Sequence, residues 1–147
     1  MTIAAADGSC IGNPGPGGWG WVTADGRSAS AAAKRTTNNR MELRAVLELL
    51  RATGPNEPLV IQSDSAYVIG IFTQWLENWR RNGMKTAAKK VVENADLIED
   101  IDAELQGRTV SFEKVPGHAG HPLNERADTL ASTAARTAVE RINNLNV

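Results

Sequence analysis

Four acidic side chains stand where the sequence predicts strand ends or helix starts. Asp7 and Asp64 each follow a short apolar run that reads as a buried strand. Glu42 falls in the first turn of one predicted helix, and Asp128 in the first part of another. If the two strands are parallel neighbours, Asp7 and Asp64 lie side by side at their carboxyl ends, where α/β sheets usually place their sites.

Clustered carboxylates repel one another unless a cation joins them, so such a group makes chemical sense as a metal site. Mg²⁺ prefers hard oxygen ligands and tolerates waters and phosphates in its shell. Two such ions about 4 Å apart can activate a water and stabilise the leaving oxygen in phosphoester cleavage. The four acids therefore predict metal-dependent phosphoester chemistry.

Each acid also has an ordinary structural alternative. Asp7 before a glycine could lie in a simple turn. Glu42 could complement a helix dipole, and Asp64 could cap a helix. Asp128 could lie on a solvated helix face. Hydrophobic periodicity alone does not reject these four interpretations.

The apolar pattern predicts the elements that must position these acids. Their order, a hairpin followed by alternating helices and strands, implies an α/β protein with a mixed sheet flanked by helices. The first helix is expected to be capped by Asn38 or Asn39 and to end near Gly54-Pro55. We expect strands at 3–6, 19–23, 28–34, 59–62 and 110–115, a glycine-rich loop at 12–20, and helical segments at about 65–82, 96–105 and 127–142.

Composition fits one globular domain spanning residues 1–147, with 41% hydrophobic and 22% charged residues. The net charge of −1 hides five basic residues and no acidic one between positions 80 and 90. From charge alone this patch is an ordinary solvated face. Cys10 is the only cysteine, so no intrachain disulfide forms, and no apolar run approaches membrane-spanning length. We expect a cytoplasmic monomer with no membrane contact.

Several blocks of sequence carry more information than any single acid. They are Asp-Gly-Ser-Cys at 7–10 with the glycine-rich 12–18, Arg-Thr-Thr-Asn-Asn-Arg-Met-Glu-Leu at 35–43, Ser-Asp-Ser at 63–65 with Tyr-Val at 67–68, and the segment 115–128 around Gly-His-Ala-Gly-His-Pro. In this order and spacing, from Asp7 to about Ala135, the blocks closely resemble those of type 1 ribonucleases H. A single block would be weak evidence, whereas the set is specific.

The resemblance implies a ribonuclease H-like fold with a five-stranded mixed sheet, three strands antiparallel and two added in parallel. It implies endonucleolytic hydrolysis of the RNA strand of RNA–DNA hybrids, leaving 5′-phosphate and 3′-hydroxyl ends. Two Mg²⁺ ions, for which Mn²⁺ can substitute, would be held by the matched carboxylates Asp7, Glu42, Asp64 and Asp128.

Two further catalytic residues follow from the resemblance. His118 matches a loop histidine thought to move a proton or help the product leave, although by itself it could be a surface histidine. Glu125 matches a further acid near the site, and it lies three residues before Asp128, so both can share a helix face. His121 is interpreted as structural, because Pro122 should open the helix behind it.

The substrate contacts also come from the resemblance. The 2′-hydroxyl is the systematic difference between RNA and DNA sugars, and small polar groups near the minor groove can recognise it. Trp75 and Trp79, one helical turn apart, resemble a channel for DNA sugars together with Asn94, although plain core packing explains them equally well. The remaining matches are Cys10, Asn13, Asn38 and Asn39 at the minor groove, Arg35 and Thr37 with Asn13 at a DNA phosphate, and Arg80, Arg81, Lys85, Lys89 and Lys90 in a basic protrusion.

The chain departs from the family pattern at a few positions. Ala66 stands where many bacterial members carry a glutamine that touches a base, and Met84 stands where an aromatic residue is common. Val91-Val92-Glu93 ends the basic patch early, and residues 137–147 carry no assignable motif. The competing hypotheses are a non-catalytic hybrid-binding module, another nuclease or recombinase of the same fold, and a structural domain. The complete set of four acids argues against the first.

Overall fold

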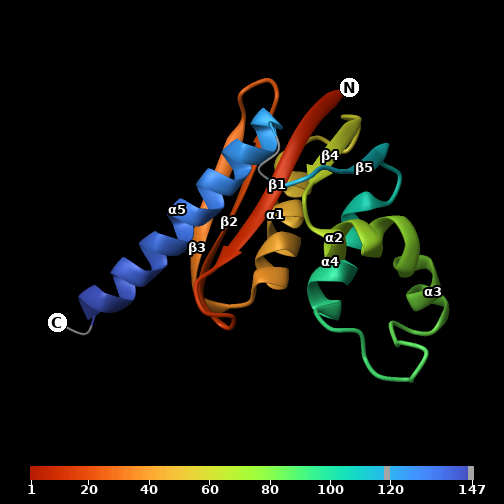
Figure 1. The fold of residues 1–147 in the computed structure, drawn as a ribbon. Helices are drawn as coiled ribbons and strands as arrows, with labels where there is room; N and C mark the ends of the chain where they lie inside the picture. The colour runs from red at the N-terminus through yellow and green to blue at the C-terminus, as the bar shows by residue number, and fades with distance from the viewer. Residues whose placement is uncertain (118–119, 146–147) are drawn as a thin grey trace.

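A computed structural model describes residues 1–117 and 120–145, and its centre is a five-stranded mixed sheet with strand order β3-β2-β1-β4-β5 (Figure 1). β1, β2 and β3 pair antiparallel, and β4 and β5 are added in parallel, as predicted. The elements are β1 (Thr2–Cys10), β2 (Gly15–Thr23), β3 (Ser28–Thr36), α1 (Asn38–Ala52), β4 (Leu59–Ser63), α2 (Ala66–Gly70), the π-helix η1 (Ile71–Trp75), α3 (Leu76–Arg81), α4 (Ala95–Leu105), β5 (Val110–Lys114) and α5 (Pro122–Leu145).

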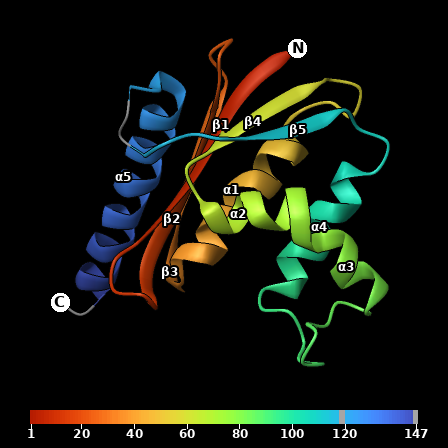
Figure 2. The same ribbon diagram turned by 45° about the vertical axis from the view of Figure 1, so that its right-hand side comes forward.

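Helices cover both faces of the sheet. α5 lies across β1, β2 and β3 on one face, while α1 packs on the other face with α4 behind it (Figures 1 and 2). The main core lies on the α1 side, where the apolar stripe of α1 meets β1, β4 and α4. Leu43, Leu47 and Leu50 of α1 and Ile98 and Ile101 of α4 are almost fully buried there. None of the helices in residues 1–117 and 120–145 combines the length and apolarity of a membrane span.

Two glycines of β2 lie on the face of the sheet that α5 covers. A Cβ atom added at Gly18 would lie 2.5 Å from the Cβ of Ala134, and one at Gly20 would lie 2.7 Å from the Cβ of Leu130. Because no real Cβ tolerates such approaches, these two positions let the helix backbone rest on the strand backbone. Trp19 and Trp21, which alternate with the glycines, pack on the opposite, α1 side.

This alternation corrects the prediction of a loop at 12–20. β2 begins at Gly15, because Gly15 and Gly17 pair with β3 and Gly17 also pairs with β1. Gly18 and Gly20 lie under α5, and Trp19 and Trp21 between and after them face the other side of the sheet. β1 is also longer than the predicted 3–6, since it pairs with β2 as far as Cys10. Asp7 therefore lies inside β1 instead of in a turn behind it.

The start of α1 also differs from the prediction. Thr37 caps the helix, and its hydroxyl accepts a hydrogen bond of 3.2 Å from the backbone N–H of Arg40. Asn38 and Asn39, the predicted caps, already lie inside α1. Glu42 is the fifth helical residue and lies just past the first turn. At the other end of the chain, α5 begins at Pro122, as predicted.

Candidate active site

Asp7 and Asp64 meet at an opening between β1 and β4. The last paired residues of these parallel strands are Ala5 and Gln62, after which β4 ends at Ser63 while β1 continues. Asp7 therefore lies two residues beyond the ladder, and Asp64 directly follows the end of β4. Carboxylate oxygens of Asp7, Glu42 and Asp64 lie within 4.8 Å of one another. Three of the four predicted metal ligands thus form one group.

Glu42 reaches this group because α1 crosses β1 at a glycine. A Cβ atom at Gly8 would lie 2.5 Å from the carbonyl carbon of Met41, so only glycine allows this close approach. Glu42 itself is 4% exposed. The sequence analysis assigned Gly8 to a turn and missed its role in the close packing of α1 on β1. The only signal in the sequence was that Gly8 directly follows the acid Asp7.

The buried carboxyls of Asp7 and Glu42 have pKa values above their ordinary ones. Burial raises the pKa of Asp7 to about 7; a hydrogen bond with Glu42 opposes this, and the charges of Asp64 and Asp128 add to it. Burial, followed by the charge of Asp7, also raises the pKa of Glu42 well above its usual range. Oε2 of Glu42 is buried and has no hydrogen-bond partner among residues 1–117 and 120–145. A cation would satisfy this oxygen and relieve the repulsion, so the donor set fits a hard divalent metal ion.

Asp128 approaches the group from α5. It is half-buried and close enough to Asp7 for its carboxyl to influence the Asp7 pKa, although it is not one of the three acids that share the 4.8 Å sphere. The four predicted ligands therefore come from β1, α1, the end of β4 and α5. Glu42 and Asp128 reach the group from opposite faces of the sheet, because α1 and α5 lie on opposite sides.

Asn124 is a neighbour of the acids that sequence reasoning did not single out. It is 2% exposed, and its Nδ2 donates to Oδ2 of Asp64 at 3.4 Å. A Cβ atom at Gly117 would lie 3.3 Å from the same Asp64 oxygen. The segment after β5 and the start of α5 therefore both lie against Asp64. The presence of Asn124 inside a matched block was the available signal.

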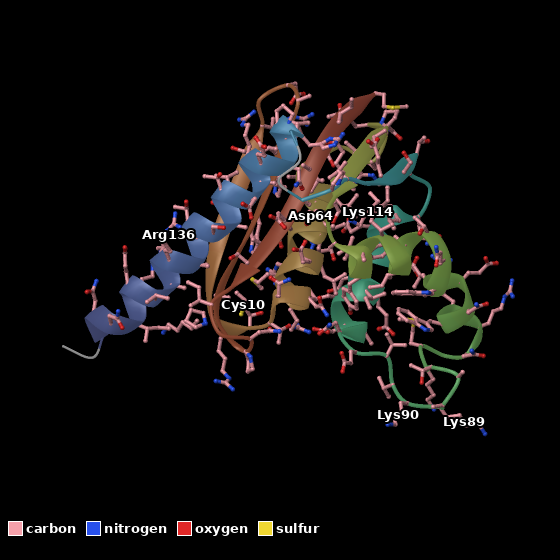
Figure 3. The ribbon with its side chains drawn as sticks, in the orientation of Figure 1. Cys10, Asp64, Lys89, Lys90, Lys114 and Arg136 are labelled. Atoms are coloured by element: carbon pink, nitrogen blue, oxygen red, sulfur yellow. The ribbon has the colours of Figure 1, made fainter. Side chains whose placement is uncertain are left out.

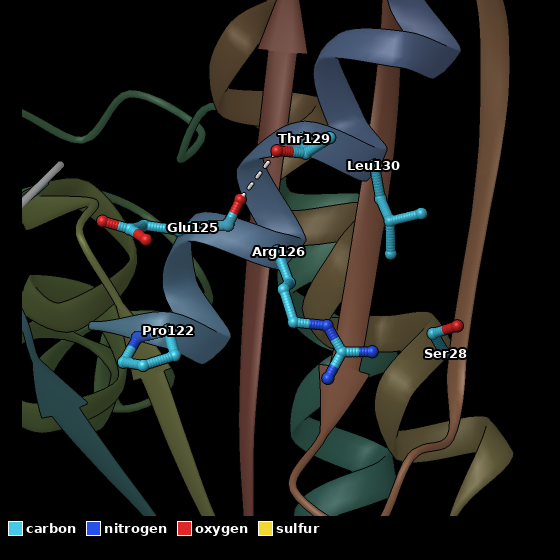
Figure 4. Close-up of a pocket in the computed structure, with 6 residues that line it drawn as sticks. All are labelled: Ser28, Pro122, Glu125, Arg126, Thr129 and Leu130. Atoms are coloured by element: carbon cyan, nitrogen blue, oxygen red, sulfur yellow. Dashed lines mark hydrogen bonds between the residues drawn. The ribbon is translucent and has the colours of Figure 1, made fainter. Parts of the chain in front are cut away.

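Of the two remaining predicted catalytic residues, His118 and Glu125, the structure describes only Glu125. His118 lies outside the described residues. Glu125 is exposed on α5, where its carbonyl accepts a hydrogen bond of 3.0 Å from the Thr129 hydroxyl (Figure 4). It lines a shallow hollow of about 500 Å³ with Ser28, Pro122, Arg126, Thr129 and Leu130. None of the three clustered acids lines that hollow, so we place the chemistry at the acids rather than there.

Most of the predicted polar contact residues gather at the junction of β1, β3 and α1. Asn13 Oδ1 accepts a hydrogen bond of 2.9 Å from the backbone N–H of Asn38. The Cys10 thiol is half-buried and donates to the Thr36 carbonyl at 3.4 Å. Arg35 is exposed on β3. A hollow of about 370 Å³, named here the amide hollow, is lined by Asn13, Thr37, Asn39, Glu93 and Asn94.

The two tryptophans line a second hollow. The ring centroids of Trp75 and Trp79 are 6.0 Å apart. The Trp75 ring packs on Gly70, where an added Cβ would lie 2.6 Å from the Cζ3 atom of the ring, and Trp79 also packs against the core. The structure shows core packing for Trp79, and the contact of the pair with DNA sugars stays a prediction. A hollow of about 220 Å³, the aromatic hollow, is lined by Tyr67, Trp75, Trp79, Thr86, Val92 and Glu93.

The predicted basic protrusion divides into paired and unpaired cations. Arg80 donates to Asp102 of α4 (Nε to Oδ2, 2.9 Å), and Arg81 pairs with Glu77 at 2.8 Å. The lysines Lys85, Lys89 and Lys90 are exposed and form no ion pair with any residue that the structure describes. Lys89 and Lys90 lie at the tip of the loop between α3 and α4 (Figure 3).

Comparison with known proteins gives a consistent result. The family model described as RNase H matches residues 1–136. Ribonucleases H from Escherichia coli O127:H6 and from Sodalis glossinidius are each 48% identical over 132 residues, which is 88% of this chain and 85% or 81% of theirs. The crystal structure of LC9-RNase H1, described as a type 1 RNase H with the type 2 active-site motif, superposes with a TM-score of 0.82 at 35% identity, covering 93% of this chain and 72% of that one.

Proposed function

The chain belongs to the ribonuclease H family, and on that premise we propose that it hydrolyses the RNA strand of RNA–DNA hybrids at Asp7, Glu42, Asp64 and Asp128. The products would be 5′-phosphate and 3′-hydroxyl ends. The observation that carries the proposal is the group of three acids within 4.8 Å, two of them buried, together with the unpartnered Oε2 of Glu42. A stable fold keeps such a group only if a cation or a proton neutralises it.

Two Mg²⁺ ions, or Mn²⁺ in their place, would neutralise these carboxylates and supply an activated water and a stabilised leaving oxygen at the scissile phosphate. The chain contributes the ligand set and its rigidity. β1 and α1, in contact through Gly8, hold Asp7 and Glu42, and Asn124 orients Asp64. Asp128 approaches from α5. Glu125, three residues before it, is proposed as a further catalytic acid, and His118 is proposed to move a proton or assist product release.

The hybrid duplex is proposed to lie across the acids, the amide hollow and the aromatic hollow. Side-chain amides, hydroxyls and indole faces suit sugars and phosphates, and unpaired lysines add phosphate contacts that carry no sequence information. Cys10, Asn13, Asn38 and Asn39 would contact the minor groove, and Arg35 and Thr37 a DNA phosphate. We propose that the protein acts as a monomer in the cytoplasm, a compartment that fits its single cysteine.

A gel assay tests the activity directly. End-labelled RNA annealed to DNA is incubated with the protein in Mg²⁺ or EDTA, beside single-stranded RNA, RNA duplex and DNA duplex. We expect cutting of the hybrid's RNA alone, abolished by EDTA. Asp64→Asn should abolish turnover while leaving hybrid binding largely intact, because one charged ligand is lost with little change in shape.

Asp100→Asn is the matched control for that variant. It makes the same charge change on the exposed face of α4, away from the acids, and should cut at the wild-type rate. Full activity of Asp64→Asn would refute the proposed metal site. Hybrid binding without cutting by the wild-type chain, in either Mg²⁺ or Mn²⁺, would favour the non-catalytic binding module.

A further inference from the structure

Glu93 lines both the amide hollow and the aromatic hollow, and we propose that it weakens the binding of the nucleic-acid strand lying there. This inference rests on the proposed function, since it concerns how the same substrate is bound. Its basis is the position of one carboxylate in a groove that otherwise suits a polyanion.

The amide hollow offers neutral polar groups to a strand. Apart from Glu93, its lining is three asparagines and a threonine. Two of these side chains are fixed by hydrogen bonds: Asn13 accepts from the backbone N–H of Asn38, and Asn94 Nδ2 donates to the Tyr67 hydroxyl at 3.0 Å. Such groups commonly contact phosphate and sugar oxygens. A carboxylate among them offers only acceptors, so it repels the same oxygens.

The aromatic hollow continues the groove. Both hollows reach Glu93, so they meet at this residue. Trp75 is 40% exposed, and its ring adjoins that of Trp79. Aromatic faces of this kind stack on bases or pack on sugars without sequence preference. A strand that follows both hollows must therefore pass Glu93 and bring a phosphate near its carboxylate.

The charge of Glu93 is not neutralised by a neighbour. Its side chain is exposed and forms no ion pair with any residue in 1–117 or 120–145. Arg40, which contacts Asn94 of the amide hollow, is already engaged, because it donates to Asn94 Oδ1 at 3.2 Å and to both oxygens of Asp96 at 3.0 and 2.8 Å. Lys89 and Lys90 lie out at the loop tip (Figure 3).

The expected size of the effect follows from Coulomb's law. One unit charge roughly 8 Å from one phosphate in water changes a binding constant about two- to threefold. Glu93→Gln should therefore lower the Kd of the hybrid about threefold at low salt, and Glu93→Lys roughly tenfold. Since the lysine adds a phosphate contact, it should also steepen the dependence of log K on log salt by about 0.9.

The test is fluorescence anisotropy with a labelled RNA–DNA hybrid in EDTA, across a salt series, for the wild type and both variants. Glu99→Gln is the matched control, because Glu99 is an exposed acid on α4 that lines neither hollow. Tighter binding by Glu93→Gln alone supports the proposal. An unchanged or higher Kd overturns it, and so does equal tightening by Glu99→Gln, which would reflect net charge only.

Wild-type cleavage of the hybrid in Mg²⁺ is measured beside the binding series, so that two failures can be told apart. If the wild type cuts but Glu93→Gln binds no tighter, the inference about Glu93 fails while the proposed function stands. If the wild type binds without cutting, the proposed function fails, and the comparison of Kd values still decides the role of Glu93.

Discussion

Replacing Asp7 with asparagine should stabilise the protein in EDTA at pH 8. Burial raises the pKa of Asp7 from its ordinary 3.8 to about 7 in the folded chain. Between these two pH values the folded protein keeps a proton that the unfolded chain has lost, so the free energy of unfolding falls as pH rises from about 4 to 7. Asparagine carries no charge to bury and avoids this loss.

The gap between the two pKa values sets the magnitude. Each pH unit corresponds to about 1.4 kcal/mol, so up to about 4 kcal/mol of stability is withheld from the wild type at pH 8. In a chain of 147 residues this is worth roughly 10 °C in Tm. Asp7→Asn should also lose most of the stabilisation that Mg²⁺ gives the wild type, expected at about 1.4 kcal/mol when Mg²⁺ is tenfold above its Kd.

Thermal unfolding followed by circular dichroism, in EDTA at pH 5 and pH 8 and then in Mg²⁺, measures these effects. The gain from Asp7→Asn should be less than half as large at pH 5, where folded Asp7 is already protonated. Asp25→Asn is a control of opposite sign, because a hydrogen bond from Arg27 lowers the pKa of Asp25 to about 2, so its ionised form favours the fold above pH 4. No gain for Asp7→Asn at pH 8, or equal gains at both pH values, would refute the reasoning.

Two other outcomes are expected. Gly18→Ala should destabilise the fold by about 1–3 kcal/mol in urea denaturation, because its Cβ would meet Ala134 at 2.5 Å. Gly54→Ala, with open space around it, is the control. Equal destabilisation by the two variants would contradict the close packing of α5 on Gly18. Replacing both Lys89 and Lys90 with alanine should reduce the slope of log K against log salt for hybrid binding by about 1.8. Arg80→Ala should change this slope less, because Asp102 already pairs with Arg80. Equal slopes for the wild type and both variants would count against a basic protrusion.

The order of strands and helices in the sequence predicted a mixed sheet flanked by helices, and the resemblance of the matched blocks supplied its three antiparallel and two parallel strands. The sequence was less informative about where strands end. Glycine in β2 has no side chain to show the period of two, so the strand residues Gly15–Gly18 looked like loop. Gly18 must be glycine because it contacts α5, more than 100 residues later in the chain, whereas a Cβ atom at Gly17 would meet Thr36 and Ser9.

The same limit applies to the acids. Asp7 was predicted at a strand end because Asp-Gly is a common turn, yet pairing with β2 carries the strand through it to Cys10. The resemblance of the matched blocks indicated that the acids converge. It gave no sign that Glu42 would be buried, with one oxygen that has no hydrogen-bond partner in the part of the chain that the structure describes. Burial depends on α1 crossing β1 at Gly8, which is a tertiary contact. Likewise Arg80 counted as a free cation until α4 supplied Asp102.

Because α5 packs directly on Gly18 and Gly20, the number of residues between Asp128 and Ala134 matters for the site as much as their identity. Ala127 and Ala134 are seven residues apart, about two turns, so both fall on the face that meets the glycines. Inserting a single residue between Asp128 and Ala134 would leave the later alanines packed on Gly18 but rotate Asp128 by about 100° away from Asp7. Substitutions along the outer face of this helix should be tolerated, whereas insertions and deletions between these residues should not.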